Sequence, residues 1–159
     1  MLWPTDNDAR IVALLHAYLS ADYRWERDGH WHDIVIGLPT PGLELAYPEA
    51  GSFGLLSAWN PQSIPRDEAT NRRQDESLQA DLSRLGVTSV PAFSSARNRT
   101  WREPGWLVFG MEVGRFDELA RRYGQLGTLW WRPGTPVRLR MYATRPAGIG
   151  DEPWVDWIE

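Results

Sequence analysis

Eight polar side chains in this sequence combine hydrogen-bonding or ionisable groups with positions close to apolar segments. They provide one carboxyl, three amides and four guanidinium groups: Asn60, Asn71, Arg72, Arg97, Arg99, Arg102, Glu103 and Gln125. Guanidinium groups bind carboxylates and phosphates through paired hydrogen bonds, and amides fix the orientation of a ligand. The set indicates a site for a small anionic ligand, such as a nucleotide or another phosphorylated metabolite.

The two asparagines each have a structural explanation as well. Asn60 precedes Pro61, a combination that is common in turns. Asn71 lies seven residues before Leu78, on the inward face of an expected helix, where a buried amide needs partners. The pair therefore either contacts a ligand or forms a structural clasp with the turn at residues 60–63.

Glu103 is the candidate catalytic residue, as a general acid or base. A wall formed by Trp101 and Trp106 would raise the pKa of its carboxyl toward neutrality. An ion pair with Arg99 or Arg102 is the structural alternative. The sequence leaves open whether the protein is an enzyme, and a hydrolase or transferase that uses Glu103 is the second functional hypothesis.

The remaining candidates also have plain alternatives. Gln125 follows Gly124 and is suited to bonding the backbone of its own loop. The arginines of residues 94–103 belong to an expected loop, and the alternative is that they are simply exposed to solvent. Arg72 lies near the start of an expected helix, where it would add a fork for an anion.

The chain lacks the residues that several kinds of chemistry require. There is no cysteine, and all 17 basic residues are arginines, so thiolate and lysine chemistry are absent. His30 and His32 would share a face of a strand, but a metal site needs a third ligand. No phosphate loop, dinucleotide fingerprint or nucleophile elbow is found. We therefore expect no metal, and the cofactor is unknown.

The composition is that of a globular protein. Of the 159 residues, 42% are hydrophobic and 24% are charged, and the formal net charge is -4. This balance gives no strong signal for nucleic acid or for an anionic membrane. The first residues lack the basic region of a signal peptide, so we expect a cytoplasmic protein.

Hydrophobic periodicity predicts the elements that must position these residues. An apolar stripe at helical spacing runs from Ile11 to Leu19, and further helices are expected near residues 66–85 and 115–123. Strands are predicted at residues 32–37, 55–59, 87–93, 106–109, 128–131 and 137–142. The fold class is therefore α/β or α+β, with about three helices and a mixed sheet of five to six strands.

This order brings the candidate residues toward one edge of the sheet. Strands joined through a helix run parallel, and strands joined by a loop run back. Asn60 leaves the second predicted strand at the edge where Glu103 and Gln125 enter the fourth and fifth. Loops at one end of a sheet are a common place for sites.

Residues 1–142 are expected to form one domain, followed by a Pro/Gly-rich tail over residues 143–159. Trp154 and Trp157 in this tail would dock on the domain itself or on a partner protein. A protein-interaction module is thus the third functional hypothesis. The sequence does not indicate an oligomeric state or a pathway.

The order of motifs also resembles a known family. The pattern consists of Tyr18, Tyr23, SAWNPQS (residues 57–63), Asn71, the cluster at residues 101–104 and YGQ (residues 123–125). It is similar to the bacterial domain-of-unknown-function family 3293, over roughly residues 15–142. The resemblance implies a bacterial origin and marks Asn60, Asn71, Glu103 and Gln125 as its polar set. It implies no activity, because the family has none assigned.

Overall fold

The computed structural model describes residues 6–96 and 102–158, which form four α-helices, one 3-10 turn and eight strands. The helices are α1 (Asp6–Ser20), α2 (Pro41–Ala46), α3 (Glu68–Arg84) and α4 (Val113–Arg122), and the turn is η1 (Pro61–Ser63). The strands are β1 (Asp22–Arg27), β2 (His30–Ile34), β3 (Phe53–Leu56), β4 (Thr88–Ser95), β5 (Arg102–Phe109), β6 (Gly127–Trp131), β7 (Arg138–Met141) and β8 (Val155–Trp157).

The centre of the fold is the run β3-α3-β4-β5-α4-β6. Its four strands lie in the order β4-β5-β3-β6, and each neighbouring pair is antiparallel. Strands β3 and β4 point the same way, as the helix between them predicts, but β5 lies between them. The same is true of β5 and β6, which β3 separates. This interleaving of two split β-α-β units is the ferredoxin-like arrangement.

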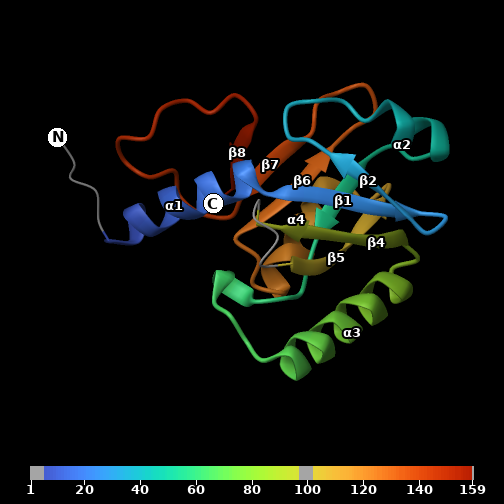
Figure 1. The fold of residues 1–159 in the computed structure, drawn as a ribbon, viewed down its shortest axis with the longest axis horizontal. Helices are drawn as coiled ribbons and strands as arrows, with labels where there is room; N and C mark the ends of the chain where they lie inside the picture. The colour runs from blue at the N-terminus through green and yellow to red at the C-terminus, as the bar shows by residue number, and fades with distance from the viewer. Residues whose placement is uncertain (1–5, 97–101, 159) are drawn as a thin grey trace.

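Two further pairs of strands extend this centre into one curled sheet (Figure 1). The hairpin of β1 and β2 joins the edge of β4, and β7 and β8 continue from β6. Beyond β2, Ile36 forms a parallel bridge with Val137, next to β7. The two ends of the sheet therefore approach each other, and one face of the sheet becomes concave.

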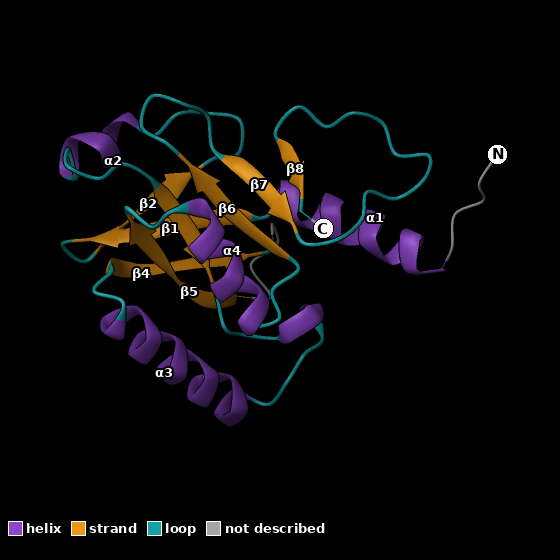
Figure 2. Ribbon diagram, turned by 180° about the vertical axis from the view of Figure 1, so that it is seen from behind, coloured by secondary structure: helices purple, strands orange, loops and turns teal. Residues whose placement is uncertain are grey.

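Alternating side chains divide the core between the two faces. On β3, Leu55 packs on the concave face with Ile11 and Leu15 of α1, whereas Leu56 packs on the convex face with α3 and α4. Figure 2 shows α4 in front of the convex face, with α3 at its lower side. A Cβ at Gly54 would lie 2.5 Å from the ring of Phe116, so glycine permits this close packing of α4.

The structure corrects the expected five to six strands and three helices. Strand β1 falls in residues for which no strand was predicted, although Tyr23 and Trp25 alternate with polar residues there and are buried. The short helix α2 lies between the strands predicted at residues 32–37 and 55–59, where prolines and glycines obscured it. Part of the expected tail forms β8, and the indole of Trp154 lies against Gly37. The domain is thus α+β, with eight strands.

Candidate functional site

A cavity of about 310 Å³ lies between α1 and the concave face of the sheet. Leu14 and Ala17 of α1 form one wall, and Leu55, Leu129 and Leu139 of the sheet form part of the other. The wall also contains polar residues, namely Tyr18, Tyr23, Ser57, Asn60, Ser63, Ser94, Glu103, Gln125 and Thr128. The cavity is large enough for a small organic molecule.

Glu103 is the one carboxylic acid among the described residues that line this cavity. It lies on β5 opposite Ser94 of β4, so the alternation of the strand directs it to the concave face together with Leu107. Its side chain is buried, and this burial raises the pKa of the carboxyl to about 8, while a hydrogen bond with Ser57 lowers it. At neutral pH the acid is therefore mostly protonated.

Ser57 fixes the surroundings of this acid at the end of β3. Its hydroxyl donates to the carbonyl of Pro104 over 2.7 Å and accepts from the N–H of Trp59 over 2.9 Å. Pro104 follows Glu103 directly, so these bonds tie the chain beyond β3 to the backbone beside the acid. Ser57 thereby holds Glu103 in place from the neighbouring strand.

Two tyrosines carry hydroxyl groups near the cavity. The hydroxyl of Tyr23 donates to the carbonyl of Tyr18, and the hydroxyl of Tyr18 is hydrogen-bonded to that of Ser63. Burial raises the pKa of both phenols, and the negative charge of an ionised Glu103 raises it further. Both tyrosines are therefore neutral hydrogen-bonding groups at neutral pH, with no tendency to ionise.

The two asparagines are bonded to each other. The Asn60 N–H donates to Oδ1 of Asn71 over 2.9 Å, and Nδ2 of Asn71 donates to Oδ1 of Asn60 over 2.8 Å. Oδ1 of Asn60 also accepts from the N–H of Arg66 over 2.9 Å. Asn60 lines the cavity, whereas Asn71 lies behind it as a clasp at the start of α3.

The turn beyond Asn60 has an unusual backbone. Asn60, Gln62 and Ser63 have φ values of 45°, 59° and 56°, although none of them is glycine. This left-handed conformation is unfavourable for most side chains and persists where surrounding contacts hold it. One such contact is the N–H of Gln62, which donates to the carbonyl of Gly124 over 2.7 Å.

Gln125 connects this turn to the start of β6. Its Nε2 donates to the carbonyls of Trp59 and Tyr123, over 3.1 Å and 3.2 Å. The side chain is buried and lines the cavity. Gln125 thus bonds loop backbone and forms part of the cavity wall at the same time.

The structure places the predicted arginines away from the described cavity wall or outside the described residues. Arg72 is exposed on α3 and pairs with Glu68. Arg102 stacks on the ring of Phe93, with its Cζ 3.7 Å from the ring centroid, and lies 5.1 Å from that of Trp31. Arg97 and Arg99 lie outside the described residues. The cavity therefore joins three of the predicted residues, Asn60, Glu103 and Gln125.

Six polar residues of the described cavity wall were not predicted as site residues, namely Tyr18, Tyr23, Ser57, Ser63, Ser94 and Thr128. Tyr23 has a recognisable signal, because it alternates with Trp25 in the pattern of a half-buried strand. Ser57 and Ser63 have none, because their roles depend on contacts between distant segments.

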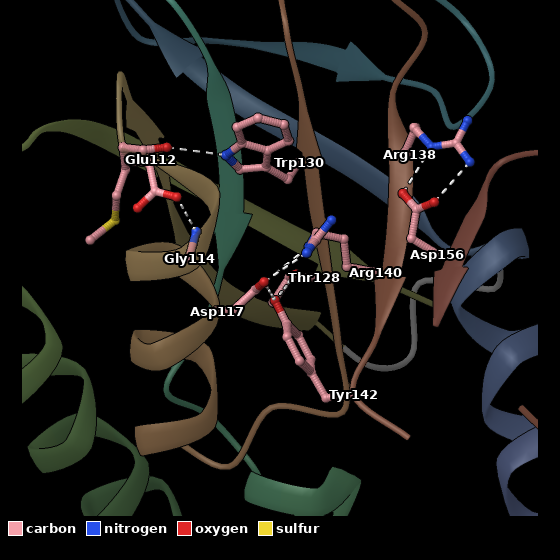
Figure 3. Close-up of polar contacts among 10 residues, drawn as sticks. Glu112, Gly114, Asp117, Thr128, Trp130, Arg138, Arg140, Tyr142 and Asp156 are labelled. Atoms are coloured by element: carbon pink, nitrogen blue, oxygen red, sulfur yellow. Dashed lines mark hydrogen bonds and ion pairs between the residues drawn. The ribbon is translucent and has the colours of Figure 1, made fainter. Parts of the chain in front are cut away.

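A second group of buried polar residues lies on the other side of the sheet (Figure 3). Arg140 binds Asp117 through two hydrogen bonds, of 2.9 Å and 2.6 Å. The hydroxyl of Tyr142 donates to Asp117 over 2.7 Å and lies 2.9 Å from the hydroxyl of Thr128. Every carboxylate oxygen in this group has a partner, which is the arrangement expected of a structural network.

Residues 6–96 and 102–158 show neither a metal-binding group nor a membrane-spanning helix. Within these ranges, no three histidine or acidic side chains are grouped in a way that would hold a metal ion. In the same residues, no helix has both the length and the apolar character needed to span a bilayer.

Comparison with known proteins finds one family model that is similar to the central part of this domain. Residues 56–127 match the family described as "Protein of unknown function (DUF3293)", which confirms the resemblance noted in the sequence. The matched range begins in β3 and ends in β6, so it covers nearly all of the ferredoxin-like centre. No curated protein and no solved structure is significantly similar to the chain.

Proposed function

We propose that the cavity beside Glu103 binds a small, largely apolar molecule through an acceptor oxygen, such as a carbonyl or carboxylate oxygen. The central observation is a buried carboxyl in a cavity of about 310 Å³ whose other walls are mostly apolar. Since the pKa of Glu103 is raised to about 8, the acid carries a proton at neutral pH and can donate it in a hydrogen bond.

The described wall supports a ligand of this kind over an ammonium compound or a free phosphate. No arginine or histidine lines the cavity among the described residues, so no cation there would neutralise a phosphate. An ammonium group would need Glu103 to lose its proton, which burial opposes at neutral pH. A carbonyl or a single carboxylate can accept from the protonated acid without that cost.

An anionic ligand remains within this proposal as a small organic acid, because a single carboxylate can accept a hydrogen bond from the protonated Glu103.

The second candidate function is catalysis in the same cavity, with Glu103 as the general acid or base of a hydrolase or transferase. The observation that favours it is the raised pKa, because an acid that titrates near neutral pH exchanges protons most efficiently. The phenol groups of Tyr18 and Tyr23 lie close enough to Glu103 for its negative charge to raise their pKa values, so both groups belong to the surroundings of the acid.

A set of three probes that share one ring tests the binding proposal. Benzamide, benzoate and benzylamine differ in the polar group while the apolar part stays constant. We expect millimolar benzamide to shift the NMR signals of Leu55 and Leu129 at pH 6 and to bind more weakly at pH 9, where Glu103 loses its proton. Benzylamine is expected to show the opposite dependence on pH.

Glu103→Gln is the matched control, because the amide keeps a donor at both pH values. In this variant the affinity for benzamide is expected to be the same at pH 6 and pH 9. If none of the three probes shifts the signals of cavity residues at either pH, the cavity is not a small-molecule site and the proposal is wrong.

A further inference from the structure

We propose that the loop of residues 61–65 is a gate that closes the cavity against α1 and opens to admit the ligand. This inference rests on the proposed function, since a gate has a role only if the cavity binds a ligand. Its structural basis is independent of any ligand, because it consists of contacts between the loop and the rest of the domain.

The base of this loop is fixed. Oδ1 of Asn60 accepts from the N–H of Arg66 over 2.9 Å, so one side chain joins the residues on either side of the loop. Nδ2 of Asn71 holds the same oxygen over 2.8 Å. The ends of the loop are therefore tied to each other and to α3, and movement is confined to the residues between them.

The tip of the loop closes the rim of the cavity through a few polar contacts. The hydroxyl of Ser63 is hydrogen-bonded to that of Tyr18 on α1, and Arg10 of α1 donates to the carbonyl of Gln62. Tyr18 and Ser63 both line the cavity, so their contact joins its two sides. Ile64 is 59% exposed, and thus apolar packing does little to hold the tip in place.

The backbone of the loop favours opening. Gln62 and Ser63 are held at φ values of 59° and 56°, a conformation that side chains other than glycine rarely adopt. Opening would release the contacts with α1 and the bonds from the N–H and Nε2 of Gln62 to the carbonyl of Gly124, and would let both residues return to a more common conformation. The closed state therefore depends on polar contacts that act against the preference of the chain, which is the property of a segment that opens readily.

The absence of cysteine from the chain allows a direct test of this opening. Ser94→Cys places a thiol on the concave face, opposite Glu103, in the wall of the cavity. The rate at which iodoacetamide labels this thiol reports how often the cavity opens. Val108→Cys, at a residue buried on the convex face, reports global unfolding in a separate protein.

Removing the contact between the loop and α1 should increase the labelling of the cavity thiol. Ser63→Ala and Tyr18→Phe each delete one side of the hydroxyl pair, and either change is expected to raise the rate about fivefold, the effect of one lost hydrogen bond. Ser77→Ala is the matched control, because it deletes a second tyrosine–serine pair, with Tyr123, far from the cavity. It should leave the rate unchanged.

The gate is supported if both variants accelerate labelling of the thiol at position 94 but not of the thiol at position 108. Equal acceleration at the two positions would show that the variants destabilise the whole domain, and would overturn the proposal. An unchanged rate at position 94, or a rate already equal to that of a free thiol before any change at the loop, would overturn it too. None of these labelling results would show whether the cavity binds a ligand.

Discussion

Two buried carboxyl groups on opposite faces of the sheet differ in their partners. Asp117 on α4 is bound by two nitrogens of the Arg140 guanidinium and by the phenol of Tyr142, so its charge is fully compensated. Glu103 on β5 faces a cavity whose described wall holds no arginine or histidine, and a hydrogen bond with Ser57 only partly offsets the effect of burial on its pKa. An acid held by an arginine stabilises a fold, whereas an acid left beside empty space is available to something else.

The difference has an energetic consequence that can be measured. A buried acid without a cation costs stability once it ionises, because burial opposes the charge. A buried acid with a bidentate arginine is costly mainly when one partner is removed. Ionising Glu103 and removing a partner of Asp117 should therefore change the free energy of unfolding in different ways.

The largest effect is expected from the ionisation of Glu103. Its pKa is about 8 in the folded protein and 4.5 in the unfolded chain, so the folded state holds the proton more tightly. Stability therefore falls as the pH rises from 4.5 to 8, and is constant with respect to this group outside that window. Urea denaturation should show Glu103→Gln to be more stable than the parent by about 4 kcal/mol at pH 8.

The same comparison at pH 4.5 is the control, because Glu103 is then protonated in the folded state and the two proteins should differ little. A parent protein whose stability is as high at pH 8 as at pH 5, relative to Glu103→Gln, would show that the acid is compensated like Asp117.

The next effect is expected from breaking the compensated pair. Asp117→Asn leaves the guanidinium of Arg140 buried without its counter-charge, since only 13% of that side chain is exposed. The free energy of unfolding is expected to fall by about 3 kcal/mol in urea denaturation at pH 7. Asp156→Asn breaks the bidentate pair with Arg138 that is also shown in Figure 3, but these side chains are 34% and 37% exposed.

We expect Asp156→Asn to cost less than about 1 kcal/mol, because solvent screens a half-exposed pair. If both variants lost the same stability, burial would not be what distinguishes Asp117, and the contrast with Glu103 would lose its basis.

A smaller effect is expected from the asparagine clasp. Asn71→Ala removes the partner of the buried Asn60 N–H, which should lower the free energy of unfolding by about 2 kcal/mol. Thr70→Ala is the adjacent control and loses an exposed bond with Asp67. A loss no greater than that of the control would show that the clasp is not needed to hold the loop over the cavity.

Sequence patterns predicted the parts of the fold that have strong periodicity. The apolar stripe of α1 and the alternation in β7 are both visible in the chain and both form. Strand β1 was missed because Tyr23 and Trp25 are surrounded by the charged residues of the DYRWER segment. Strand β8 was missed because its three residues are too few to show a period. Pairing with distant strands decides both of these elements, and local sequence does not record it.

The candidate site could be predicted only in part from the sequence, for a similar reason. Asn60, Glu103 and Gln125 line one cavity, and each lies next to a predicted strand or helix, which is why the sequence could bring them together. The contacts of Ser57 and Ser63 could not be foreseen, since each joins segments 45 or more residues apart. The position of Arg102 on the rings of Phe93 and Trp31 likewise depends on the hairpin of β1 and β2 joining β4.

The most direct test of this account is the titration of the Glu103 carboxyl by carbon-detected NMR between pH 3 and pH 10. Glu103→Gln identifies the signal by removing it. An unpaired acid beside the cavity should titrate with a midpoint near 8, well apart from the exposed glutamates. A midpoint near the ordinary value of 4.5 would mean that the carboxyl is hydrated or neutralised, and would contradict the central claim.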